Sequence, residues 1–148
     1  MPQSLAKVLL HIVFSTKNRE PYISDELQPN LHAYLAGACR AVNSEGLRVG
    51  GTKDHVHIVC TLPRTLTISK LLEEIKKSSS SWVKDQGVHQ FAWQAGYGAF
   101  SVSQGHLSTV ISYIENQQEH HREKTYKEEV LDFLKEYNIE CNEKYLWE

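Results

Sequence analysis

Two histidines separated by one residue are the clearest candidates for chemistry in this sequence. His55 and His57 lie in the run 55–62, whose alternation of apolar and polar residues predicts a β-strand. Successive strand side chains point to opposite faces, so the two imidazoles stand side by side while Val56 points into the core. Imidazole is a common ligand of divalent metals, and the pair can share one cation. Two polar residues on an exposed strand face are the alternative.

Two other histidine-based phosphate chemistries fit the same residues poorly. A histidine-triad hydrolase would need a third histidine at the next alternate position, where the sequence has Val59. A binuclear metallohydrolase would need an aspartate and another histidine just downstream, where residues 58–61 read Ile-Val-Cys-Thr. The histidine pair therefore predicts a site for one metal ion.

A tyrosine and a glutamine form the second candidate pair. Tyr113 and Gln117 are four residues apart in a segment predicted to be helical, so they lie on the same helix face. That face flanks the apolar stripe of Val110, Ile111 and Ile114, which places both side chains at the edge of the packed surface. A half-buried packing tyrosine and a solvated glutamine are the alternatives.

Taken together, these four side chains describe one site for phosphoryl chemistry. The Tyr113 oxygen can attack a DNA phosphate and keep the 5′ phosphate as a phosphotyrosine ester. A cation held by His55, His57 and the Gln117 amide oxygen would withdraw charge from the phosphate and orient it. Because all three ligands are neutral, the full charge of the cation would act on the phosphate.

The motifs that carry these residues resemble those of a known family, the single-tyrosine HUH transposases of insertion-sequence-200-like elements. The resemblance rests on Lys-Asp-His-Val-His at 53–57 and on Tyr-Ile-Glu-Asn-Gln-Gln at 113–118, about 55 residues later. His-Ile-Val-Phe-Ser-Thr-Lys at 11–17 and Trp-Gln-x-Gly-Tyr at 93–97 are also similar. The resemblance spans about residues 5–120, and the two main motifs together are more specific than either alone.

The resemblance implies a DNA transposase of a mobile element, an enzyme that nicks and rejoins DNA. It implies that His55, His57 and Gln117 bind Mg²⁺ or Mn²⁺ and that Tyr113 is the nucleophile. It also implies single-stranded DNA substrates with hairpin ends. Finally, it implies a homodimer in which the tyrosine helix of one chain serves the active site of its partner.

Other residues compete for these roles. Tyr126 and Tyr137 are rival nucleophiles, but both fall on the apolar stripe of the last predicted helix, and we expect them in the core. His120 and His121 follow Tyr113 closely. We expect these histidines to be exposed residues at a helix end, and a role near the phosphate stays open.

The elements that must position these residues follow the order β-α-β-β-α-β, with two further helices. This order predicts an α+β fold, a ferredoxin-like split βαβ antiparallel sheet with helices packed on one face, plus C-terminal helices. The other sheet face would be open and would carry His55 and His57. Thr67 is expected to cap the second helix, and Thr125 with Glu128 forms a capping box for the last one.

We expect one domain over residues 1–148, with a core at about 5–120 and an acidic, helical C-terminal tail at about 121–148. The net charge of −2 is unevenly distributed, because residues 1–110 hold 11 basic and 8 acidic residues whereas 111–148 hold 5 and 10. The first segment can therefore form a basic DNA-binding groove, and the tail is expected to pack on the body or the partner. Candidate phosphate contacts, otherwise residues of solvated surfaces, are Lys17, Arg19, Lys53, Lys70, Lys76, Lys77 and Lys84.

Two other functions stay open. One is a domesticated or REP-associated relative that binds DNA hairpins with little or no transposition. The other is an RNA-binding module that stacks bases on an exposed sheet, although the strand at 55–62 lacks the aromatic residues that such modules use.

The sequence also bears on location. No apolar run approaches the ~20 residues that cross a bilayer, so we expect no membrane segment. The N-terminus lacks the basic start of a signal peptide. Cys39, Cys60 and Cys141 are far apart and lack CxxC spacing, which favours reduced thiols in a cytoplasmic protein.

Overall fold

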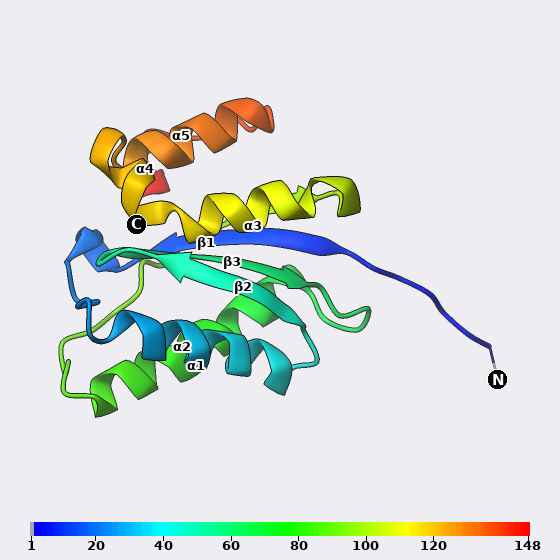
Figure 1. Cartoon of the computed structure of the whole chain (residues 1–148), viewed down its shortest axis with the longest axis horizontal. Coiled ribbons are helices and arrows are strands. Elements are labelled where there is room, and N and C mark those ends of the chain that lie inside the picture. Colours follow the sequence, from blue (N-terminus) through cyan, green and yellow to red (C-terminus); the bar gives the residue numbers. More distant parts are fainter. Residues whose placement is uncertain (1) are drawn as a thin grey trace.

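The alternating and helical patterns of the sequence form a four-stranded antiparallel sheet with helices on both sides (Figure 1). The structure, a computed structural model, describes residues 2–148. The sheet has the strand order β2-β3-β1-β4. Its elements are β1 (Leu9–Ser15), α1 (Gln28–Ala41), β2 (Gly46–Gly51), β3 (His55–Thr61), α2 (Ile68–Asp85) and β4 (Gly98–Val102). This split βαβ arrangement confirms the predicted α+β, ferredoxin-like fold.

The main core lies between the sheet and helices α1 and α2. Alternate side chains of β1 and β3 point into this core, and they include the buried residues Ile12, Phe14 and Ile58. The helices contribute apolar residues at helical spacing, and Thr67 caps α2 by accepting a hydrogen bond from the Lys70 backbone N–H.

The second face of the sheet is covered rather than open, so that expectation is wrong. Helix α3 (Leu107–Glu115) crosses β2 and β3, and α5 (Tyr126–Glu136) lies above it (Figure 1). The stripe of α5 is apolar and must be buried, and Tyr126 and Val130 pack with Val13 of β1 and Phe100 of β4 in a second core. The C-terminal tail therefore builds part of the fold.

Local breaks in the chain shape this upper layer. Asn116 separates α3 from α4 (Gln117–Glu123), so the helix predicted across Tyr113 and Gln117 is interrupted. The capping box of Thr125 and Glu128 begins α5 as predicted, and a short α6 (Glu143–Leu146) follows. Among the helices of residues 2–148, none combines the length and the apolar character that a membrane crossing requires.

Gly50 of β2 lets α3 approach the sheet closely. A Cβ at this position would lie 2.5 Å from the Ile114 carbonyl oxygen and 2.7 Å from its Cγ2. Gly50→Ala is therefore expected to lower the free energy of unfolding by about 1–3 kcal/mol in urea denaturation, because α3 must shift outward. Gly105→Ala is the matched control, since nothing lies within 4 Å of its Cβ, and it should change stability by less than about 0.5 kcal/mol. Equal stability of the two variants would contradict this close packing.

Candidate active site

His55 and His57 share one face of β3, as predicted, but both are completely buried. The expected exposed position is wrong because α3, α4 and α5 cover this face of the sheet (Figure 1). The Nε2 atom of His55 lies 3.0 Å from Oε1 of Gln117, the first residue of α4. Gln117 is itself buried, so the break at Asn116 turns its side chain into the site.

Two neighbours, Asp54 and Thr52, contact the Nδ1 side of the His55 ring. Its Nδ1 lies 2.7 Å from Asp54 Oδ1 and 3.0 Å from Thr52 Oγ1. A neutral imidazole carries one N–H, and when Nδ1–H donates to Asp54, the lone pair of Nε2 faces Gln117 Oε1. Two acceptor atoms that face one another in this way are suited to bind one cation, and a carboxylate behind a histidine is a common support for a metal ligand.

His57 belongs to a second buried pair. Its Nδ1 lies 2.8 Å from Nε2 of His11 on β1, and its own Nε2 lies 2.9 Å from Glu129 Oε1. Burial lowers the pKa of His57 to about 4 and, together with neighbouring His57, that of His11 to about 3. Both rings are therefore neutral at physiological pH. When neutral His57 carries its one proton on Nδ1 and donates it to His11 Nε2, and His11 carries its own proton on Nδ1, the His57 Nε2 lone pair is free to bind a metal.

Tyr113 reaches the same cluster from α3. Its hydroxyl donates a hydrogen bond to Oε2 of Glu129, and its ring lies 5.7 Å from that of His57. Burial and the adjacent carboxylate raise the pKa of the Tyr113 phenol far above its usual value. In this arrangement the hydroxyl is protonated, and attack on a phosphate requires that it pass its proton to another group.

Glu129 of α5 joins the parts of the site. The carboxylate is 4% exposed, and its Oε1 lies 3.5 Å from His121 Nε2 and 3.7 Å from His55 Nε2. Although burial opposes its ionisation, contacts with His121 and His57 hold the pKa of Glu129 well below its usual range. Burial likewise opposes the charge on His121, but Glu129 raises the His121 pKa.

The donor set fits a divalent metal. Among the described His, Cys, Asp and Glu side chains, His55, His121 and Glu129 form a group whose donor atoms all lie within 4.8 Å of one another. Gln117 Oε1 joins this group, because it lies 3.0 Å from His55 Nε2 and 3.1 Å from His121 Nε2. Imidazole nitrogens suit transition metals such as Zn²⁺ and Fe²⁺, whereas amide and carboxylate oxygens suit Mg²⁺ and Mn²⁺, so this mixed donor set fits a divalent metal of either group.

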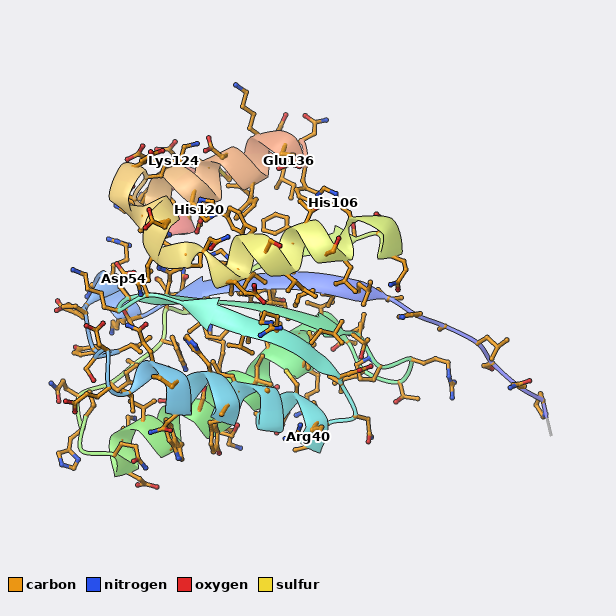
Figure 2. The ribbon with its side chains drawn as sticks, viewed as in Figure 1. Arg40, Asp54, His106, His120, Lys124 and Glu136 are labelled. Carbon is orange, nitrogen blue, oxygen red and sulfur yellow. The ribbon has the colours of Figure 1, made fainter. Side chains whose placement is uncertain are left out.

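Several pockets border the cluster, and two of them lie beside α4. One is lined by residues that include Lys53, Asp54, His121 and Tyr126. The other lies where α4 and α5 meet Tyr113 and is also lined by His120, Lys124 and Glu129. Figure 2 shows Asp54 at the end of the sheet, with His120 and Lys124 on the helical layer above it.

The basic residues proposed from sequence fall into two groups. Lys17 and Arg19 follow β1 and Lys53 precedes β3, and Ser15 pairs with His55 in the sheet, so these three lie at the site's end of the sheet. The others lie on α2, which packs on the opposite face: Lys70, Lys76, Lys77 and Lys84.

Two of these four lysines have partners within the fold. Lys76 donates to the backbone carbonyls of Gln94, Ala95 and Gly96, so we leave it out of the proposed DNA contacts. Lys70 pairs with Glu73 and Glu74 on its own helix.

The rival tyrosines have structural partners. Tyr126 is buried and donates to Gln94 Oε1, whereas Tyr137 donates to the Ser101 carbonyl oxygen. Tyr137 is 39% exposed, so its predicted core position is wrong, because its ring packs on Phe100 at the edge of the second core. Tyr113 alone among the three bonds to the carboxylate of the histidine cluster.

Sequence reasoning did not identify His11 or Glu129 as site residues. Both left a signal in the sequence pattern. His11 alternates with the core residues of β1 and so faces the same side as His57. Glu129 interrupts the apolar stripe of α5 three residues after Tyr126, which places a carboxylate on the buried side of an amphipathic helix.

Fold and site together define a small α+β protein with a buried, histidine-rich cluster that could hold a metal ion and with one adjacent tyrosine. The comparisons with known proteins then identify its family: residues 4–117 match the family model described as "Transposase IS200 like", so the chain belongs to the IS200-like transposases. The remaining residues, which include His121 and Glu129, lie outside the matched segment. A search of curated proteins gives no match.

Solved structures of similar fold include the following two. One is a candidate transposase from Deinococcus radiodurans R1, with 21% identity, a TM-score of 0.64 and coverage of 79% of this chain and 98% of that chain. The other is a REP-associated tyrosine transposase bound to a REP hairpin, with 18% identity, a TM-score of 0.59 and coverage of 82% and 73%.

Proposed function

We propose that this chain cleaves and rejoins single-stranded DNA at hairpin-containing ends, with Tyr113 as nucleophile and a divalent metal bound by His55, His57 and Gln117. Membership of the IS200-like transposases supports DNA processing of this kind. The observation that carries the proposal is the convergence of Tyr113, His57 and Glu129, since a carboxylate bonded to both ties the nucleophile to the histidine cluster.

In the proposed reaction the Tyr113 oxygen forms a bond to phosphorus and the bond to the 3′ oxygen breaks. The phenol proton leaves to a nearby acceptor, for which Glu129 Oε2 is positioned, and the released 3′ oxygen takes up a proton. Rejoining reverses these steps with a new 3′ hydroxyl. Bound Mg²⁺ or Mn²⁺ would supply charge neutralisation at the phosphate. The chain's own contribution is to orient the imidazoles through Asp54 and His11.

A DNA hairpin is the proposed substrate. The REP-associated transposase of similar fold is bound to a REP hairpin, and we extend this ligand class to the present chain. Lys17, Arg19 and Lys53 lie at the site's end of the sheet and are the proposed phosphate contacts, with Lys77 and Lys84 of α2 as more distant ones. We further propose that the protein acts in the cytoplasm.

The structure also bears on the assembly that the resemblance implies. Tyr113 bonds to Glu129 of its own chain, close to His57 of the same chain. We therefore propose that one chain can complete a site by itself, and that a homodimer, where it forms, need not exchange its tyrosine helices.

A hairpin-binding relative with little turnover is the second candidate function. Two features favour it: α5 covers the site, and a hydrogen bond holds Tyr113 against the buried Glu129 carboxylate. Both must change before a phosphate reaches the tyrosine. The RNA-binding alternative loses support, because the sheet face that would stack bases is covered by α3 and packed against α5.

Incubation with metal and DNA tests turnover directly. We expect the protein, mixed with Mn²⁺ and a single-stranded oligonucleotide carrying an imperfect hairpin, to form a covalent adduct visible as a shifted band in a denaturing gel. EDTA should abolish the adduct and added Mn²⁺ should restore it, because the neutral ligands bind a metal that can be removed. Hairpin binding without any adduct, across hairpins of different loop and flank, would favour the second candidate.

A further inference from the structure

We infer that Glu129 of α5 is itself a ligand of the catalytic metal, binding through Oε1 while Oε2 holds the hydroxyl of Tyr113. This inference rests on the proposed function and deepens it, because it adds a carboxylate from the C-terminal tail to a set otherwise made of neutral donors. The tail would then be a working part of the active site.

The distances around Glu129 Oε1 are those expected between ligands of one ion. This oxygen lies 2.9 Å from His57 Nε2, 3.5 Å from His121 Nε2 and 3.7 Å from His55 Nε2. Two donors bound at about 2.1 Å to the same cation are separated by about 3.0–3.4 Å at right-angled or tetrahedral positions. Small movements of His55 and His121 would complete this geometry around a shared ion.

The charge of Glu129 points to the same conclusion. Burying a carboxylate is costly unless a cation compensates it. At 4% exposure, Glu129 contacts imidazoles, the Tyr113 phenol and the Gln117 amide, and no described lysine or arginine side chain forms an ion pair with it. Without a metal, protonated His121 is a partner that can supply positive charge beside Glu129, and a divalent cation among these donors would take over that role. It would also explain why an acidic side chain interrupts the apolar stripe of α5.

The two oxygens of the Glu129 carboxylate have different proposed partners, the metal for Oε1 and the Tyr113 hydroxyl for Oε2. With Oε1 on the metal, Oε2 keeps its hydrogen bond from Tyr113 and so holds the nucleophile one carboxylate group away from the ion. The phosphate that the metal orients and the oxygen that attacks it are then positioned by the same side chain.

Metal affinity of the full-length protein tests this inference independently of nicking. After EDTA treatment and dialysis, Mn²⁺ is titrated by calorimetry, with free Mn²⁺ followed by electron paramagnetic resonance. We expect Glu129→Gln to lower Mn²⁺ affinity by at least about 10- to 100-fold. Glu136→Gln, which makes the same charge change at an exposed position of α5 labelled in Figure 2, should bind as the wild type does.

The controls separate the possible outcomes. His55→Ala should lose Mn²⁺ binding, which tests the proposed metal site itself. Wild-type affinity in Glu129→Gln beside a loss in His55→Ala would overturn the role of Glu129 and leave the proposed function standing. Tighter binding in Glu129→Gln would also overturn it, since Glu129 would then compete with the metal. No Mn²⁺ binding by the wild type would defeat the proposed function as well. If Glu129→Gln is unfolded after EDTA treatment, Glu129→Asp is titrated instead. Its shorter side chain should also lower Mn²⁺ affinity, and wild-type affinity would overturn the role of Glu129.

Discussion

Tyr113→Phe is expected to abolish covalent attachment to DNA, with at least about a 10³-fold loss of adduct, while leaving the fold nearly as stable as before. The change removes one oxygen and keeps the ring, which packs against His11, His57 and Phe133. Glu129 loses one donor but keeps its contacts with His57 and His121, so we expect the free energy of unfolding to fall by only about 1 kcal/mol. Hairpin affinity should be nearly unchanged.

Tyr137→Phe is the matched control for this experiment. It also removes one hydroxyl hydrogen bond, to the Ser101 carbonyl oxygen, but lies outside the histidine cluster. We expect wild-type adduct formation from it. Mass spectrometry of digested adduct should place the nucleotide on the peptide that contains Tyr113. A nucleotide mapped to Tyr126 or Tyr137 would refute the assignment of the nucleophile.

The parts of this site that could be predicted from sequence are those whose positions depend on a pattern within one strand or helix. The histidine pair of β3 was predictable because alternation along one strand fixes which side chains share a face. Tyr113 and Gln117 were found through their helical spacing, although Asn116 interrupts that helix and both side chains still reach the cluster. Local patterns of this kind survive small errors in element boundaries.

The cover of the sheet could not be predicted in the same way. Strand order and the split βαβ fold follow from the sequence of elements, but the docking of α5 depends on contacts between Val130 and strands more than 25 residues away in sequence, such as β4. The sequence signals an amphipathic helix without saying which surface it covers. For the same reason the sequence did not indicate a site role for Glu129, because its partners belong to three other elements.

The cover also changes what the acidic tail does. Its negative charge argued against DNA contact, and the observed packing gives that charge a different role, because Glu129 is buried among imidazoles. Access to the site can then come from the pockets beside α4 and α5, from the pocket lined by His11 and Tyr113, or from movement of α5 itself. A tail that both completes the site and covers it would link cleavage to the packing of α5.

Mixing two inactive variants distinguishes a site built within one chain from a site shared between two. We expect His55→Ala protein combined with Tyr113→Phe protein to regain no adduct formation. In the structure α3 is anchored by Ile114 against Gly50, and residues 103–106 are the only link between β4 and α3. Donating Tyr113 to another chain would require α3 to leave this contact and Tyr113 to leave Glu129 and Phe133 of α5.

The measurement needs proof that the chains had the chance to exchange. Light scattering gives the oligomeric state, and native mass spectrometry of one isotope-labelled variant reports mixed dimers. A mixture of wild type with Tyr113→Phe should show only the activity of its wild-type fraction. A dimeric mixture of the two inactive variants that recovers about a quarter or more of the wild-type adduct, in the range expected when mixed dimers hold one composite site, would contradict the single-chain site. Such recovery would mean that α3 carries its tyrosine to the partner, as the family resemblance implies, and that its contact with Gly50 is released during the reaction.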